Sequence, residues 1–263
     1  MMQTSQPVGA LLRAWRQRRR MTQMDLALEA EISPRHLSFM ETGRAQPSRE
    51  MLMRLTEELE VPLRERNALL VAAGFAPLYR ERPLQDAALE AARKAIDLVL
   101  AAQKPFPAFA LDRHWNVVAS NHALPELYEG VASELLQAPV NVLRLSLHPR
   151  GLAPRIANLA EWRAHLLSRL RRQVELTADA QLAELAREAT AYPVDGAFES
   201  DNLAREVLVP FRVRSRAGVL SFFSMTTVFG SPVDVTLAEL AVESFFPADG
   251  TTAEAVRGLA AGN

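Results

Sequence analysis

Apolar residues recur at helical spacing through the first third of the chain. Val8, Leu11, Leu12 and Trp15 lie three or four positions apart, which predicts a helix beginning at residue 8. The same spacing, together with N-cap and proline signals at the starts, predicts four further short helices over residues 23–30, 34–41, 48–59 and 63–73. The pattern therefore predicts an all-α domain over residues 8–74.

Prolines and charges interrupt this pattern at residues 75–83, which we interpret as a linker. A long amphipathic helix is then predicted over residues 84–102. Beyond Pro105 the pattern predicts a strand from Phe109, a turn at Asp112-Arg113 and a second strand ending at Ser120. Helical segments are predicted over residues 121–128, 141–147, 158–174 and 178–191.

The last part of the chain favours strands. Two are predicted over residues 207–214 and 219–228, with a hairpin connection at 215–218. Residues 237–246 fit a third strand, and helical periodicity is also possible there. Two strands, a helical insert and three strands predict an α+β domain over residues 84–263, with one antiparallel sheet and helices packed on a face.

Composition excludes several classes of protein. The 263 residues include no cysteine, so disulfides, thiolate metal sites and a cysteine nucleophile are excluded. No stretch approaches 18 apolar residues, and the first charges follow the first apolar residues, which is the reverse of a signal peptide. We therefore expect a cytoplasmic protein with no membrane partner.

The formal net charge of −1 conceals an uneven distribution. Residues 1–80 carry 12 arginines and nine acidic residues, a balance of +3, whereas residues 81–263 carry 18 basic and 22 acidic residues, a balance of −4. Clustered basic charge is typical of a nucleic-acid-binding domain. The split therefore points to the first domain as the one that meets nucleic acid.

Residues 22–41 have the pattern of a helix-turn-helix, in which two helices meet across a short turn. Ala27 supplies the small residue where the helices cross, and Ile32 is expected to pack under the turn. Leu37 and Met40 are expected to bury the second helix. The outward positions of that helix, which enter the major groove in this motif, are Arg35, His36, Ser38 and Phe39.

A family resemblance becomes specific at this point. The positions that match the Cro/repressor-type (Xre) helix-turn-helix pattern are Thr22, Gln23, Leu26, Ala27, Ser33, Leu37, Ser38, Glu41, Gly43, Pro47 and Ser48. More narrowly, SPRHLSFMETGRAQPSREM followed by VPLRERNALLVAAGFAPLY resembles the MmyB-like regulators. The similarity continues through ALDRHWNVVASNHAL, NVLRLSLHP and GSPVDVTLAELAVESFFPAD, and so spans nearly the whole sequence.

The chain departs from the family at one position of the turn. Many members have glycine where this chain has Glu31. A left-handed backbone at that position costs a residue other than glycine about 1 kcal/mol, which tertiary packing can override.

The resemblance implies base contacts that the chemistry supports. The planar fork of Arg35 matches O6 and N7 of guanine. His36 and Ser38 are expected to donate to bases or phosphates, and Phe39 to contact a thymine methyl group.

Phosphate contacts are expected around the same helices. Gln23 and nearby backbone N–H groups are expected to donate to a phosphate. Thr22 and Ser33, which cap the two helices, are further expected DNA contacts. Arg44 and Ser48 are further expected phosphate contacts. Attraction that is independent of sequence is expected from Arg13, Arg16, Arg18, Arg19 and Arg20. The expected partner is a double-stranded DNA operator, bound by a homodimer through half-sites about 34 Å apart.

For the second half, the resemblance implies a PAS-related module whose apolar pocket takes a fatty-acid-like or other small lipophilic effector. The expected lining and polar anchors are Phe109, Trp115, Asn121, Leu143, Arg144, Trp162, Leu166 and Phe222, with His122 and His148 as further polar candidates. The alternative is a constitutive dimerisation or protein-interaction module whose interior is filled by its own side chains.

The sequence shows little that points to catalysis. It has no glycine-rich phosphate loop, no H-E-x-x-H and no G-x-S-x-G, and its histidines lack metal-ligand spacing. We expect no enzymatic activity, no cofactor and no metal. The sequence predicts a ligand-responsive bacterial transcriptional regulator.

Overall fold

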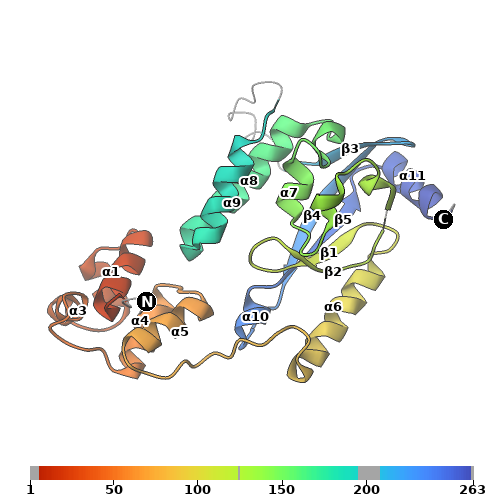
Figure 1. Cartoon of the computed structure of the whole chain (residues 1–263). Helices are drawn as coiled ribbons and strands as arrows, with labels where there is room; N and C mark the ends of the chain where they lie inside the picture. Colours follow the sequence, from red (N-terminus) through yellow and green to blue (C-terminus); the bar gives the residue numbers. More distant parts are fainter. Residues whose placement is uncertain (1–5, 124, 195–207, 262–263) are drawn as a thin grey trace. The chain divides into compact units, whose positions relative to one another are not determined.

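A computed structural model describes residues 6–123, 125–194 and 208–261, and divides the chain into two compact units (Figure 1). The first unit holds the chain up to Arg82 with the short segments Glu175–Thr177 and Pro232–Val235, and the second holds the remainder. The division after Arg82 falls within the segment predicted as a linker, 75–83.

The described residues of the first unit form the predicted all-α domain. Its helices are α1 (Val8–Arg18), α2 (Gln23–Glu29), α3 (Pro34–Glu41), α4 (Arg49–Glu58) and α5 (Leu63–Ala72). Local signals set the helix starts, because Thr22, Ser33 and Ser48 each accept a hydrogen bond from a backbone N–H in the first turn that follows. At α2 the Asp25 carboxylate also accepts from the Thr22 N–H, which completes a capping box.

All five helices contribute to one core. Its fully buried side chains include Leu12, Leu26, Leu37, Met40, Leu52, Leu55, Leu69 and Leu70. Helix α1 approaches α3 so closely that a Cβ atom on Gly9 would lie 2.3 Å from the carbonyl oxygen of Met40 and 2.8 Å from that of Glu41. Glycine at this position therefore permits the packing that supports the helix-turn-helix.

The second unit contains the predicted antiparallel sheet. Its strands are β1 (Ala108–Leu111), β2 (Val117–Ser120), β3 (Phe211–Ser215), β4 (Gly218–Val228) and β5 (Ala241–Pro247), in the order β2-β1-β5-β4-β3 with every pair antiparallel. The hairpin between β3 and β4 is tight, because Ser215 pairs with Gly218, whose φ is +102°. The strand predicted over 207–214 begins at Phe211, and Val207 lies outside the described residues.

Helices precede, separate and follow these strands along the chain. They are α6 (Glu90–Ala102), α7 (Val142–Leu147), α8 (Leu159–Thr177), α9 (Ala180–Ala191), α10 (Val235–Ala238) and α11 (Gly250–Ala261). Short 3-10 turns are η1 (Ala87–Leu89), η2 (Pro125–Tyr128), η3 (Ser133–Leu136) and η4 (Ala153–Arg155).

Several predicted boundaries were wrong. The helix expected from residue 84 begins at Glu90, because the Asp86 side chain accepts from the Ala88 N–H and starts a 3-10 turn first. Of the segment expected as a helix over 121–128, Pro125–Tyr128 form the 3-10 turn η2, and His122 has a left-handed backbone (φ +50°) that does not fit a right-handed helix. Residues 237–246 divide between the end of α10 and β5, and α11 was not predicted.

The two faces of the sheet have different surroundings, because side chains alternate along each strand. One face carries Phe109, Phe222 and Phe245 and packs with Trp162 and Leu166 of α8. The opposite face carries Ala108, Ala110 and Val242, which pack with α6. Helices thus cover both faces (Figure 1), where the sequence predicted one.

Candidate functional site

The helix-turn-helix presents the predicted recognition positions on α3. Arg35 and His36 are exposed, whereas Ser38 and Phe39 are half-buried beside Leu37 and Met40 in the core. The turn before α3 places Glu31 in the left-handed region at φ +53°, the conformation for which glycine is favoured.

Phe39 brings two arginines together on this face. The guanidinium of Arg35 lies 5.3 Å from the centre of the Phe39 ring, and that of Arg44 lies 5.9 Å from it. The Arg44 N–H also donates to the Phe39 carbonyl oxygen at 2.8 Å, which fixes the start of the following loop. The ring therefore holds two cationic groups beside one another at the surface of α3.

The polar residues at the helix starts have internal partners. The hydroxyls of Thr22, Ser33 and Ser48 act as N-caps, as described above. The Gln23 amide donates from Nε2 to Oε2 of Glu41 at 2.8 Å. The contacts of these four residues with DNA stay predictions. The structure adds that their side chains form hydrogen bonds at the helix ends.

Arg16 was expected to add attraction that is independent of sequence, and the structure gives it another role. Its guanidinium is buried and donates from Nε to Oε1 of Glu41 at 2.6 Å and from Nη2 to Oε2 at 2.8 Å. A third bond runs from Nη1 to the carbonyl oxygen of Met21. Arg16 therefore links α1 to α3 through a buried ion pair. Arg13, Arg18 and Arg20, in contrast, are exposed.

The charge state of Glu41 follows from this pair. Burial opposes ionisation, but hydrogen bonds from Arg16 and Gln23 and the charges of Arg16 and Arg13 outweigh it, so the pKa of Glu41 lies below its usual range. The hydrogen bond to Glu41 likewise raises the pKa of Arg16.

The second unit contains an apolar cavity of about 80 Å³ between the sheet and its helices. Its lining includes six of the residues expected at a ligand site, Phe109, Trp115, Leu143, Trp162, Leu166 and Phe222. The structure thus brings together side chains that are widely separated in sequence. An interior space of this size can hold several water molecules.

The expected polar anchors lie elsewhere. The Asn121 amide donates to the carbonyl oxygens of Leu100 and Phe106 and accepts from the Ala108 N–H, so it joins the end of α6 to β1. Arg144 is exposed and forms a bidentate ion pair with Glu188.

The two histidine candidates also lie outside the cavity lining. His122 is exposed and pairs with the Ser120 hydroxyl. The His148 ring packs edge-on against Tyr192, and its Nδ1 accepts from the Arg150 N–H. These groups therefore have structural partners of their own.

Glu243 was not among the residues predicted from the sequence, yet its side chain lines the cavity and is 5% exposed. Arg169 of α8 donates to both of its oxygens, from Nη1 to Oε1 at 2.8 Å and from Nη2 to Oε2 at 3.2 Å. The alternation of β5 offered a signal, because Ala241, Glu243 and Phe245 share one face of the strand.

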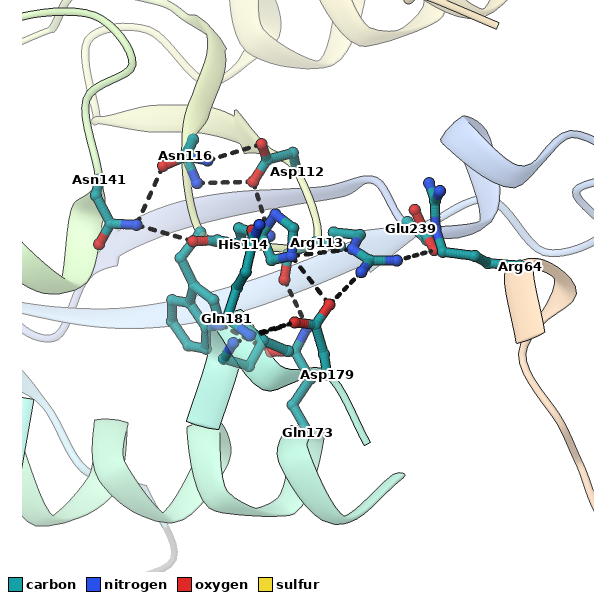
Figure 2. A network of polar contacts seen from close by, with 12 residues as sticks. Arg64, Asp112, Arg113, His114, Asn116, Asn141, Gln173, Asp179, Gln181 and Glu239 are labelled. Carbon is teal, nitrogen blue, oxygen red and sulfur yellow. Dashed lines mark hydrogen bonds and ion pairs between the residues drawn. The ribbon is translucent and has the colours of Figure 1, made fainter. Parts of the chain in front are cut away.

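A polar network around Asp112, His114 and Asp179 holds the β1–β2 turn (Figure 2). Trp115 of this turn lines the cavity. Trp115 lies at the β1–β2 turn with φ +68°, and the Asp112 carboxylate fixes the turn by accepting from the N–H groups of His114 and Asn116. The indole Nε1 donates to Oε1 of Gln173 in α8 at 2.7 Å.

The same turn is held to the start of α9. Asp179 pairs with the side chains of Arg113 and His114 and also caps α9 through the N–H groups of Gln181 and Leu182 (Figure 2). Burial opposes ionisation of Asp179, but hydrogen bonds from His114 and from the α9 backbone and the charge of Arg113 outweigh it, so the pKa of Asp179 is lowered. One cavity residue is thereby connected to two helices.

Within the described residues, no helix combines the length and apolar character needed to span a membrane. No curated protein matches the chain. Among solved structures, the crystal structure of the clp gene regulator ClgR from Corynebacterium glutamicum is 28% identical, covers 37% of this chain and 90% of that chain, and has a TM-score of 0.23.

Two family models match the chain. A helix-turn-helix domain model matches residues 7–69, and the model of the MmyB-like transcription regulator ligand binding domain matches residues 92–259. Because the second match spans more than half of the sequence, the chain belongs to the family of MmyB-like transcription regulators.

Proposed function

We propose that the protein is a sequence-specific DNA-binding regulator that acts as a homodimer and responds to a small lipophilic effector. The observation that carries the DNA-binding part is the arrangement on α3, where exposed Arg35 and the following Arg44 flank the ring of Phe39. A short helix with an exposed arginine near its start, in a helix-turn-helix, is suited to enter the major groove.

The side chains of α3 divide between bases and phosphates. Arg35 has the donor fork that recognises guanine, and His36, Ser38 and Phe39 lie one to four positions further along the helix. Arg44 follows the helix and is suited to a phosphate, which would fix the register of α3 on the duplex. Gln23, Thr22, Ser33 and Ser48 would add contacts together with the backbone N–H groups at the helix starts.

Selection of a binding site from random duplex DNA, followed by affinity measurements at one fixed salt concentration, tests this assignment. Arg35→Ala should cost about 1–3 kcal/mol at the selected site and relax its sequence preference. Arg44→Ala should weaken binding to all DNA sequences to a similar degree and reduce the salt dependence of the affinity. If wild type and Arg35→Ala each bind selected and scrambled DNA equally well, base recognition by Arg35 is wrong.

The homodimer is proposed because regulators of this type recognise two half-sites about one helical turn, or 34 Å, apart. Mass measurement by light scattering, with duplexes that carry one or two half-sites, tests it. Two protomers on a two-site duplex are expected. A single protomer on that duplex at saturating protein would contradict the dimer.

The effector is proposed from the cavity. Six apolar or aromatic side chains that the sequence predicted as ligand contacts line one interior space, which is the environment that favours a lipophilic molecule. The family resemblance further suggests a fatty-acid-like molecule. Such a ligand would change DNA binding only through different affinities for two arrangements of the protein.

Organic extraction of the purified protein, followed by mass spectrometry, would identify a bound lipophile. Trp115 and Trp162 line the cavity, so intrinsic fluorescence gives an independent measure of ligand entry. The rival is a constitutive dimerisation or interaction module. Absence of an extracted lipophile, with no fluorescence or DNA-affinity response to added lipophiles, would favour that rival.

A further inference from the structure

We propose that the cavity selects lipophilic molecules whose polar end is a neutral hydrogen-bond donor, such as an alcohol, and that the Glu243 carboxylate accepts this hydrogen bond. The inference rests on the proposed function, because it assumes that the cavity takes a lipophilic ligand. It goes further in assigning the chemistry of the ligand's polar end and the residue that recognises it, because it keeps a fatty-acid-like apolar chain but replaces the carboxylate end of a fatty acid by a hydroxyl.

Glu243 occupies an inward position in the middle of the sheet. In register it lies beside Phe109 of β1 and Thr226 of β4. Its neighbour on the same face of β5, Phe245, also lines the cavity, as does Phe109. Among the described residues that line this space, Glu243 is the one with a charged side chain, so it dominates the polarity of an otherwise apolar wall.

Arg169 fixes this carboxylate as an acceptor. The guanidinium donates once to each oxygen of Glu243, donates to the Thr226 hydroxyl at 3.3 Å, and lies 5.0 Å from the centre of the Trp115 ring. Arg169 and Glu243 thus form an ion pair in which the guanidinium occupies one side of the carboxylate. An ionised carboxylate has about four acceptor positions, so the two bonds from Arg169 leave capacity for a donor from the cavity side.

The charge balance decides which kind of donor fits. Glu243 and Arg169 already neutralise each other, so an ammonium ligand would bring an uncompensated charge into a buried site. A carboxylate ligand would place a second acceptor against the buried carboxylate, with Arg169 outside the cavity lining. A hydroxyl group satisfies the acceptor and adds no charge.

The hydroxyl groups of the lining belong to Ser146 and Tyr128 and carry no charge, so Glu243 remains the charged acceptor that distinguishes one ligand end from another. The Ser146 hydroxyl oxygen already accepts from Nε1 of Trp162 at 3.0 Å. Tyr128 also lines the cavity, and burial raises the pKa of its phenol, so it brings a neutral hydroxyl and no charge.

Three ligands of matched size test the proposal on the full-length protein. They are 1-octanol, its isomer heptyl methyl ether, which accepts but cannot donate, and octanoate. Affinity is measured by titration calorimetry and by the fluorescence of the cavity tryptophans at neutral pH. Octanol should bind at least about tenfold more tightly than either of the other two, since a hydrogen bond to a charged group is worth that factor or more.

Variants then assign the preference to Glu243. Glu243→Gln removes the charge at nearly constant size and leaves Arg169 without its counter-charge, so the preference for octanol over octanoate should disappear or reverse. Glu254→Gln, at an exposed position of α11, is the matched control and should keep the preference. Should Glu243→Gln fail to fold, the comparison of the three ligands on the wild-type protein still tests whether the cavity prefers a hydrogen-bond donor.

The outcomes separate this inference from the proposed function. If octanoate or the ether binds wild type as tightly as octanol, the cavity takes lipophiles but the assignment of a donor to Glu243 is wrong. An unchanged octanol preference in a folded Glu243→Gln variant overturns the assignment as well. If none of the three ligands binds, the lipophile-sensing function itself fails, and the inference falls with it.

Discussion

Arg16 of α1 and Glu41 at the end of α3 form a buried ion pair in which two nitrogens of the guanidinium each meet one oxygen of the carboxylate. Their side chains are 9% and 1% exposed. Glu41 also accepts a hydrogen bond from Gln23 at the start of α2, so the pair involves both helices of the helix-turn-helix. One carboxylate therefore connects three helices.

Glu41→Gln should destabilise the helical unit by about 3 kcal/mol, because it leaves the Arg16 charge buried without a partner. Hydrogen–deuterium exchange read by mass spectrometry suits this measurement, since it follows α1–α5 separately from the second unit. Glu29→Gln, at an exposed position of α2, is the control and should change exchange little. Equal protection of α1 and α3 in both variants would contradict a stabilising role for the pair.

The pair also predicts a response to acid. The pKa of Glu41 is lower in the folded protein than its ordinary value of about 4.3. Ionised Glu41 therefore contributes fully to the free energy of unfolding above that value, and this contribution is lost as the pH falls through the folded pKa. The stability difference between wild type and Glu41→Gln should therefore shrink as the pH falls from about 6 to about 3. Exchange protection of α1 and α3, measured across this range, provides the test. If the stability difference stays constant or grows on acidification, ionised Glu41 is not the source of the extra stability of wild type.

Glu31 offers a stabilising substitution. Its φ of +53° is unfavourable for a side chain with a Cβ atom, so Glu31→Gly should stabilise the helical unit by about 1 kcal/mol or slightly less. Glu57→Gly, within α4, should instead destabilise by about 1 kcal/mol, because glycine is a poor helix former. Glu31→Gly should slow hydrogen–deuterium exchange in α2 and α3 relative to wild type. Faster exchange in this variant would show that the glutamate makes a compensating contact.

The helical unit was predictable because its signals are local. Thr22, Ser33 and Ser48 act as caps within three residues of the groups they bind, and the turn at Glu31 follows from the spacing of the helices on either side. Arg16 was misinterpreted because an arginine in a basic run has the same local pattern whether it meets solvent or a buried carboxylate. Its partner lies 25 positions away in the chain.

The cavity was predictable only in its apolar part. Phe109, Phe222 and Trp162 could be assigned to inward faces from strand and helix periodicity. The polar position could not, because Glu243 faces the cavity only through the register of β5 against β1 and β4. Asn121 was expected to bind a ligand, but backbone groups of neighbouring segments occupy its amide.

The role of the cavity can be separated from the stability of its walls by filling it. Leu166 of α8 lines the cavity and is buried, so Leu166→Phe should occupy part of the space and weaken binding of octanol or a similar lipophile by about tenfold or more. DNA affinity without ligand should stay near that of wild type, because the DNA-binding helices belong to the other unit. Ser168→Phe, two residues along and exposed on the same helix, is the matched control and should leave ligand binding unchanged. Fluorescence titration of each variant, with thermal unfolding to confirm folding, provides the measurement. If a folded Leu166→Phe protein still binds the lipophile with wild-type affinity, the ligand occupies another site and the cavity is an ordinary packing space.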